Sequence, residues 1–300
     1  MREYEVWHDE FKGDDSVNEY WHGIFFMPVD KKIEIIEHLK DIKEKHKTDK
    51  NKDVKFAGCL KDFNTTNAKI VRNNLSLFSH LLINKESEAK TDIHFWNKKD
   101  IYEQNYEPFL TIEGIYGCKF VLLHIPDNHE NMTNFPLSYA DRVETTFRIG
   151  FKGGAHLLFG DKSPIIIKNF YFDGYEHHGR KIDFGRITKG EFRNYCNICE
   201  NCSIDDRGMK ERNDETKIII SFIDNIVGGL SAILKNKTDS GNVLFGLKSI
   251  YERLKNKQIL KNHNGRWYKS INVSKLVIKN GEITFPDFFE NTEQISLFDL

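Results

Sequence analysis

Apolar residues recur along this chain with two different spacings. Short runs rich in aromatic and β-branched residues occupy positions 2–8, 21–28 and 164–174, and such runs are typical of β-strands. Positions 31–47 and 65–84 instead place apolar residues three or four apart with charged residues between them, as in amphipathic helices. The mixture of strands and covering helices predicts an α/β domain.

The rest of the chain continues this mixture. Residues 118–126 are apolar enough for a strand that is buried on both faces, and Pro126 ends it. Residues 138–159 and 215–235 predict long helices, and the second is so widely apolar that we expect it to pack against the sheet. The sequence also predicts two strands within 92–117, a helix over 190–200, a strand over 202–206, a helix over 243–257 and a hairpin turning at Asn280-Gly281.

Composition places the chain among globular proteins. Its 300 residues, 39% of them hydrophobic and 13% aromatic, suffice for one large α/β domain or two small ones. Because 44 Lys and Arg residues balance 45 Asp and Glu residues, contact with nucleic acid has to come from a local basic patch. An apolar signal core and a run of about 18 apolar residues are both missing, so we expect a cytoplasmic protein with no membrane partner.

Acidic residues stand at the ends of several apolar elements. Asp9 and Glu10 follow the first predicted strand, Asp173 follows a later one, and Asp224 lies within the apolar helix. A carboxylate in such a place is costly to bury unless a cation neutralises it. Ligand sites gather where the strands of an α/β sheet end, and converging carboxylates are what Mg²⁺ or Mn²⁺ requires.

These residues also have ordinary structural explanations. Asp9 and Glu10 can begin a hairpin loop, and Asp173 together with Gly174 forms a good turn. Asp224 has one alternative, a salt bridge to a buried Lys or Arg. The sequence leaves both explanations open for each residue.

The order of these motifs resembles the RNase H-like family known as domain of unknown function 3800. The Asp-Glu-Ser-Gly motif that ends the first strand of this family corresponds to DEFKG from Asp9, and its Glu-x-Lys segment corresponds to DVK from Asp53. A later strand ending in Asp corresponds to FYFD, which ends at Asp173. The closing Gln-Leu-Ala-Asp helix corresponds to SFID, with Ser221 in the Gln position and Asp224 retained.

The resemblance spans residues 3–235 and implies an RNase H-like mixed sheet flanked by helices. We therefore expect an RNase H-like domain over residues 1–236, a C-terminal helix and hairpin appendage over 237–290 and a flexible tail over 291–300. Such proteins are found widely in bacteria, often near mobile elements and phage-defence genes.

The activity that the resemblance implies is that of a divalent-metal-dependent nuclease. Two Mg²⁺ or Mn²⁺ ions, about 3.5–4 Å apart, would orient a water molecule and stabilise the leaving oxygen of a phosphodiester. Asp9, Asp173 and Asp224 would bind the metal. The implied catalytic residues are Asp9, Glu10, Asp53, Asp173 and Asp224.

Departures from the family pattern keep a second hypothesis open. Asp53 replaces a Glu, and Phe11 and Lys12 replace the small residues of the first motif. The alternative is a catalytically inactive RNase H-like interaction subunit of a defence complex, which would bind a partner protein or nucleic acid.

Basic residues provide a candidate patch for the nucleic-acid backbone, or else ordinary surface charge. The candidates are Arg142, Arg148, Lys152, Arg180, Lys189 and Arg207. Cys196, Cys199 and Cys202 have Cys-x2-Cys-x2-Cys spacing, but zinc normally takes four ligands and no fourth is evident. We therefore expect free thiols rather than a zinc site.

The C-terminal tail carries a separate signal. Gln294, Leu297 and Phe298 belong to a segment that resembles the short peptide by which many bacterial DNA-processing proteins dock on the replicative sliding clamp. The alternative is a tail that packs Leu297 and Phe298 onto its own domain.

Overall fold

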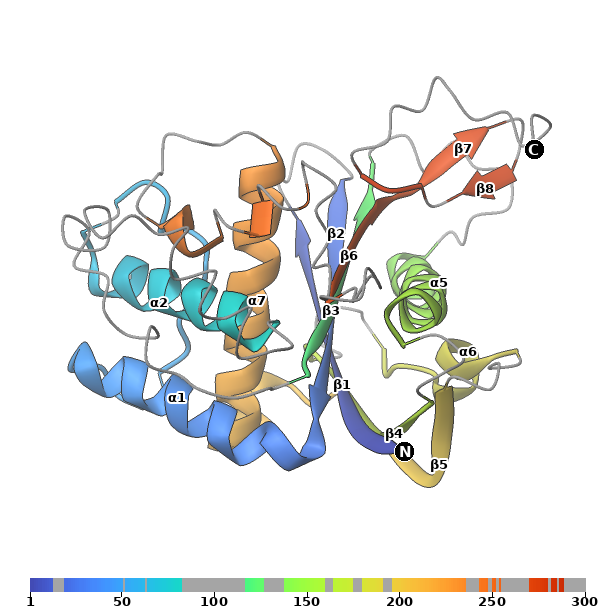
Figure 1. Ribbon diagram of the computed structural model, residues 1–300, viewed down its shortest axis with the longest axis horizontal. Helices are drawn as coiled ribbons and strands as arrows, with labels where there is room; N and C mark the ends of the chain where they lie inside the picture. The colour runs from blue at the N-terminus through green and yellow to red at the C-terminus, as the bar shows by residue number, and fades with distance from the viewer. Residues whose placement is uncertain are drawn as a thin grey trace, which may run out of the picture.

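Helices cover both faces of one central sheet in the computed structural model of the chain (Figure 1). The structure describes residues 1–12, 19–50, 52–62, 64–82, 117–126, 138–159, 164–174, 180–190, 196–235, 243–247, 250–251, 254, 270–279, 282–284 and 286–288.

The central sheet has six strands in the order β5-β4-β1-β2-β3-β6. Strands β1, β2 and β3 are antiparallel neighbours, β4 and β5 run parallel to β1, and β6 runs parallel to β3. This mixed sheet, flanked by helices, is compatible with an RNase H-like α/β fold and confirms the predicted fold class. The strands are β1 (Arg2–Lys12), β2 (Tyr20–Pro28), β3 (Lys119–Ile125), β4 (Ile165–Phe172), β5 (Cys196–Asp205) and β6 (Ile271–Lys275).

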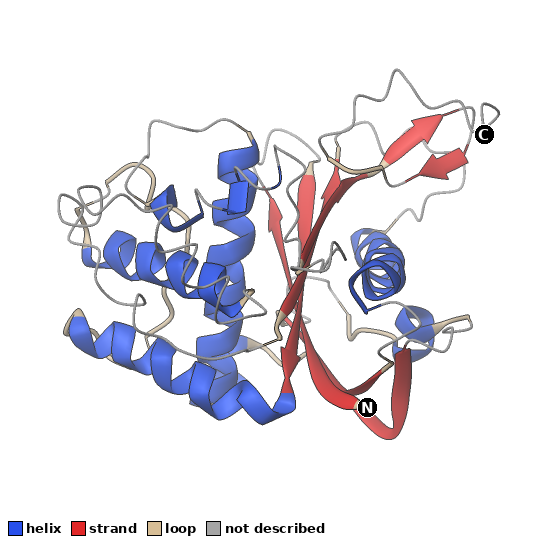
Figure 2. Cartoon of the chain, viewed as in Figure 1, coloured by secondary structure: helices blue, strands red, loops and turns tan. Residues whose placement is uncertain are grey.

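Figure 2 shows that the helices divide between the two faces of the sheet. Three of them, α1 (Lys32–Lys45), α2 (Thr66–Leu81) and α7 (Asp214–Leu234), lie on one face, with α7 directly against β1 and β2. The opposite face carries α5 (Tyr139–Phe159) and the short α6 (Phe184–Thr188). The smaller elements are the 3-10 turns Val29–Lys31, Met209–Glu211 and Leu244–Leu247, and a hairpin of β7 (Val277–Lys279) and β8 (Glu282–Thr284).

The alternating side chains of β1 build two separate apolar cores. Trp7 belongs to the core under α7, whereas Tyr4 and Val6 belong to the core under α5. The same alternation directs Asp9 to the α7 face and Glu10 to the α5 face. Because they point to opposite faces of the sheet, only Asp9 of these two adjacent residues faces the carboxylate carried by α7.

Helix α7 approaches the sheet closely because Gly23 of β2 has no side chain. A Cβ atom at Gly23 would lie 2.1 Å from Cγ2 of Val227, and Gly23 is the residue that pairs with Asp9 in the β1–β2 ladder. By length and composition α7 is apolar enough to cross a membrane, but 83% of its most apolar window is buried inside the domain, as in the core helix of a globular fold.

The structure corrects the helix predicted over residues 190–200. Residues 196–205 instead form β5, an edge strand that pairs in parallel with β4. The segment is rich in Cys, Asn and Ser, which are poor helix formers, so pairing with β4 overrides a weak local preference.

Other predicted elements differ in extent. The first strand continues beyond residue 8 to Lys12, because β2 pairs with it over that whole length. In the predicted helix 243–257, the described residues include the 3-10 turn Leu244–Leu247. The two strands predicted within 92–117 lie outside the described residues, except for Gly117 at the end of the second. The predicted hairpin at Asn280-Gly281 is confirmed by β7 and β8, and β6 before it forms the edge of the main sheet.

Candidate functional site

Parallel pairing of β1 with β4 brings two of the predicted carboxylates together. His8 pairs with Phe172 at the end of this ladder, and the Asp173 N–H donates to the His8 carbonyl oxygen over 3.2 Å. The next residues, Asp9 and Asp173, are therefore neighbours, and both are buried. Two strands distant in sequence thus place one carboxylate each at the same edge of the sheet.

Helix α7 contributes the third carboxylate, Asp224, and also binds the backbone of the segment that follows residue 52. The Val54 N–H donates to Ser221 Oγ over 3.1 Å, and Asn225 Nδ2 donates to the Val54 carbonyl oxygen over 2.7 Å. The Phe56 N–H donates to Asp224 Oδ2 over 2.7 Å. Since Val54 and Phe56 are both fixed to α7, the intervening residue, Lys55, is fixed with them.

Electrostatic effects show that these groups share one site. Burial raises the pKa of Asp9 well above its ordinary range, and the negative charges of Asp173 and Asp224 raise it further. The Lys55 ammonium partly offsets this effect. The charges of Asp9, Asp173 and Asp224 all act on Lys55, so the carboxylates outnumber the cation, and we call Asp9, Asp173, Asp224 and Lys55 the acid cluster.

The pKa values of the other members fit the same arrangement. Burial raises the pKa of Asp224, while the Lys55 charge and the Phe56 N–H act in the opposite direction. Burial by itself would lower the pKa of Lys55, but Asp224, Asp173 and the other nearby carboxylates raise it above the ordinary value for lysine. Lys55 therefore stays charged inside the acid cluster.

Two predicted catalytic residues lie apart from the centre of the acid cluster. Glu10 points to the α5 face, where Tyr139 Oη donates to its Oε1 over 3.4 Å and His8 Nδ1 lies 3.8 Å from its Oε2. Asp53 is exposed and forms an ion pair with Lys55, with 3.6 Å between Oδ2 and Nζ. Asp53 thus lies at the rim, two residues before Lys55 in the extended segment.

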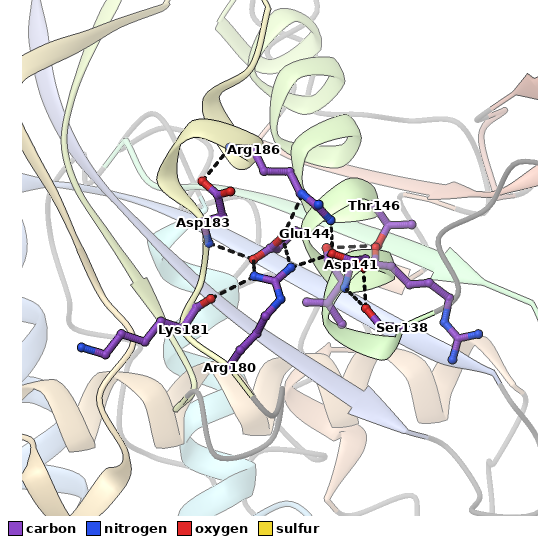
Figure 3. Close-up of polar contacts among 10 residues, drawn as sticks. Ser138, Asp141, Glu144, Thr146, Arg180, Lys181, Asp183 and Arg186 are labelled. Carbon is purple, nitrogen blue, oxygen red and sulfur yellow. Dashed lines mark hydrogen bonds and ion pairs between the residues drawn. The ribbon is translucent and has the colours of Figure 1, made fainter.

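The basic residues predicted to bind nucleic acid are divided among several environments. Arg180 binds both carboxylate oxygens of the fully buried Glu144 at 2.7 Å, as Figure 3 shows. Arg207 forms an exposed ion pair with Asp205 at 2.7 Å. The remaining candidates, Arg142, Arg148, Lys152 and Lys189, belong to α5 or to the end of α6, across the sheet from α7.

Sequence reasoning missed Lys55 and Arg212 as site residues. Arg212 is buried beside the end of β4, where its guanidinium donates to the carbonyl oxygens of Phe172 and Arg207. Burial lowers the pKa of Arg212, and the charges of Asp205 and Asp173 oppose that effect. The signal for Lys55 was the segment Asp53-Val54-Lys55, which corresponds to the Glu-x-Lys motif of the family that the chain resembles.

The donor atoms of the acid cluster match a hard divalent cation in type, because carboxylate oxygens are the ligands that Mg²⁺ and Mn²⁺ prefer. Their arrangement is not a preformed ligand set: within the described residues, no group of three or more His, Cys, Asp or Glu side chains is placed to hold a metal ion. One oxygen of Asp224 already accepts the Phe56 N–H. Metal binding would therefore need side-chain rotation within the acid cluster.

The cysteine triplet and the tail complete the list of predicted sites. Cys196, Cys199 and Cys202 lie in β5 as free thiols. Gln294, Leu297 and Phe298 lie outside the described residues, so clamp binding stays a prediction.

Comparisons with family models, with curated proteins and with solved structures find no match to this chain. The function is therefore inferred from the geometry of the acid cluster.

Proposed function

We propose that this protein is a divalent-metal-dependent nuclease that hydrolyses phosphodiester bonds at the acid cluster. The observation that carries the proposal is the convergence of Asp9, Asp173 and Asp224 from β1, the end of β4 and α7. Burial raises the pKa of Asp9 and repulsion from Asp173 and Asp224 raises it further, and a bound divalent cation would relieve that repulsion. Perturbed carboxylates of this kind are typical of functional sites.

Each residue has a role in this proposal that follows from its position. Asp9, Asp173 and Asp224 would hold Mg²⁺ or Mn²⁺, which when bound activates water and stabilises charge on the scissile phosphate. The charged ammonium group of Lys55 would attract the phosphate and counter the repulsion between it and the carboxylates. Ser221 and Asn225 position Lys55 by binding the Val54 backbone.

Cleavage assays test this proposal. The purified chain is incubated with labelled single- and double-stranded DNA and RNA in Mg²⁺, in Mn²⁺ and in EDTA. We expect cleavage with metal and none with EDTA, and a loss of rate of about 100-fold or more in Asp9→Asn and in Asp224→Asn. Asp41→Asn, which removes an exposed carboxylate from α1, is the matched control and should retain full activity.

Two results would contradict the nuclease. One is intact substrate with every nucleic acid and metal tested. The other is metal-dependent cleavage that survives in both acid-cluster variants, since activity would then originate elsewhere or in a contaminant.

One observation favours the alternative of an inactive interaction subunit. Lys55 already supplies a positive charge to the carboxylates, and Asp224 accepts the Phe56 N–H. Lys55 and Asp224 therefore both have structural roles without a metal. Calorimetric titration with Mn²⁺ separates the two hypotheses. The nuclease requires heat of binding that disappears in Asp9→Asn, whereas the interaction subunit requires none.

A further inference from the structure

A pocket of about 570 Å³ lies between α5 and α6, on the face of the sheet opposite α7. Sites for small molecules usually have volumes of about 300–1,000 Å³. The polar residues that line this pocket are Asp141, Thr145, Arg148, Asp183, Arg186 and Lys189. The acid cluster lies across the sheet from it, so the two sites are separate.

The two carboxylates in the lining differ in how their charges are compensated. Asp141 accepts hydrogen bonds from Ser138 Oγ at 2.6 Å and from Arg180 at 2.7 Å, and it also pairs with Arg186. Asp183 Oδ1 accepts the Arg186 N–H at 3.2 Å, at the start of α6. The charge of Asp141 is therefore balanced by arginines, whereas Asp183 has a backbone donor and keeps its negative charge.

Buried ion pairs hold the wall of the pocket in place. Glu144 is fully buried behind it and binds Arg180 with both oxygens, while Arg186 Nε lies 3.4 Å from Glu144 Oε2 (Figure 3). The Asp183 N–H also donates to Glu144 Oε1 over 2.8 Å. Two arginines and two carboxylates therefore cancel in charge, and they fix α6 against α5.

The remaining lining cations have no such carboxylate partner. Among the residues that the structure describes, neither Arg148 nor Lys189 forms an ion pair. Lys152, one helical turn after Arg148, donates from Nζ to the Lys189 carbonyl oxygen, which brings a third cation to the same place. Burial and the charge of Arg148 both lower the pKa of Lys152. Arg148 and Lys189 outnumber the single uncompensated carboxylate, Asp183, so the lining of the pocket is net positive.

We infer that this pocket binds a phosphate-bearing small molecule of about the size of a mononucleotide, with Arg148 and Lys189 contacting the phosphate. A phosphate group alone would fill only part of the volume, and the remainder has room for a sugar and a base. Thr145 contributes a hydroxyl group that either donates or accepts a hydrogen bond. This proposal is independent of nuclease activity, because the acid cluster contributes nothing to the pocket.

Calorimetric titration of the full chain tests the inference. The probes are inorganic pyrophosphate, the four ribonucleoside 5′-monophosphates and a 5′-phosphorylated single-stranded oligonucleotide. We expect saturable binding of at least one monophosphate, weakened about ten-fold or more in Arg148→Gln and in Lys189→Gln. Lys168→Gln, an exposed cation on β4 paired with Glu3, is the charge-matched control and should bind normally.

The Asp224→Asn variant distinguishes this inference from the proposed function. It should bind the monophosphate with unchanged affinity even though nuclease activity is lost. The inference is overturned if no monophosphate binds, if Arg148→Gln binds as tightly as the unmodified chain, or if only the oligonucleotide binds. The last outcome would make the basic rim a contact for a polymer backbone instead.

Discussion

Two clusters of acidic residues lie on opposite faces of the same sheet, and their charges are arranged in opposite ways. On the α5 face, Asp141 and Glu144 are matched by Arg180 and Arg186 in close ion pairs. On the α7 face, three carboxylates share the charge of Lys55, and burial together with the charges of Asp173 and Asp224 raises the pKa of Asp9.

The difference separates a structural cluster from a candidate functional one. Matched charges stabilise the contact between α5 and α6, because each buried carboxylate has its donors. Unmatched carboxylates destabilise the folded state, so their retention in a buried place indicates a task other than stability. Charge-removing substitutions should therefore have opposite effects on stability at the two clusters.

The largest effect is expected from Arg180→Met in the balanced cluster. This substitution leaves the fully buried Glu144 carboxylate without its bidentate partner, so the free energy of unfolding should fall by about 3 kcal/mol. Urea denaturation measures the change. The matched control is Arg207→Met, which breaks an ion pair whose arginine side chain is 53% exposed and should cost less than about 1 kcal/mol. Equal losses in the two variants would refute the distinction between buried and exposed pairs.

Gly23→Ala should have the next largest effect, because it pushes α7 away from the strand that carries Asp9. The new Cβ atom would lie 2.1 Å from Val227 Cγ2 and 3.0 Å from Phe120 Cζ, so we expect a loss of about 2 kcal/mol in stability.

Gly153→Ala is the control for this substitution. Nothing lies within 4 Å of the new Cβ atom, and the residue is within helix α5, so stability should rise by about 0.5–1 kcal/mol. Thermal unfolding of both variants measures the contrast. A tolerated alanine at Gly23 would show that α7 adjusts its distance from the sheet freely.

Asp9→Asn should stabilise the protein by about 1 kcal/mol near neutral pH, measured in EDTA. The substitution removes a charge that burial and two neighbouring carboxylates disfavour. The asparagine oxygen still accepts the Glu10 N–H, which now donates to Asp9 Oδ1 over 2.9 Å. A clear loss of stability would mean that Lys55 neutralises the acid cluster fully.

The smallest expected effect is the change with pH in the stability difference between Asp9→Asn and the unmodified chain. The pKa of Asp9 is higher in the folded chain than in the unfolded chain, in which it is about 4. The favourable contribution of protonated Asp9 to stability is therefore complete below about pH 4. The contribution is lost as pH rises through the folded pKa. The advantage of Asp9→Asn should therefore be near zero at about pH 4 and grow toward neutral pH. A pH-independent advantage would show that the disfavoured charge of Asp9 is not its cause.

Local pattern was enough to predict much of the fold. Apolar spacing predicted α2, α5 and α7 and the strands β1 to β4, because each of these elements repeats its buried positions with a fixed period. Only the end of β5 was predicted, as the strand over 202–206, because β5 lies at the edge of the sheet, where only one neighbour stabilises it and its side chains alternate weakly between buried and exposed.

The candidate site was predicted less completely than the fold. The sequence indicated Asp9, Asp173 and Asp224, since a carboxylate beside buried apolar residues is unusual wherever the chain later folds. It also grouped Glu10 with them, although adjacent residues of a strand point to opposite faces, and that rule could have separated Glu10 from Asp9.

What the sequence determined by itself is therefore the periodicity of its helices and strands and the presence of acidic residues within apolar surroundings. Only the tertiary structure decided that Lys55 lies among three carboxylates, and that Arg180 belongs to Glu144 rather than to a free basic patch. The physical reason is the distance along the chain over which each property is determined. A burial pattern depends on residues that are neighbours in sequence. Charge balance at a site depends on strand pairing and helix packing between distant segments, 36 residues apart for Arg180 and Glu144 and more than a hundred apart for Lys55 and Asp224.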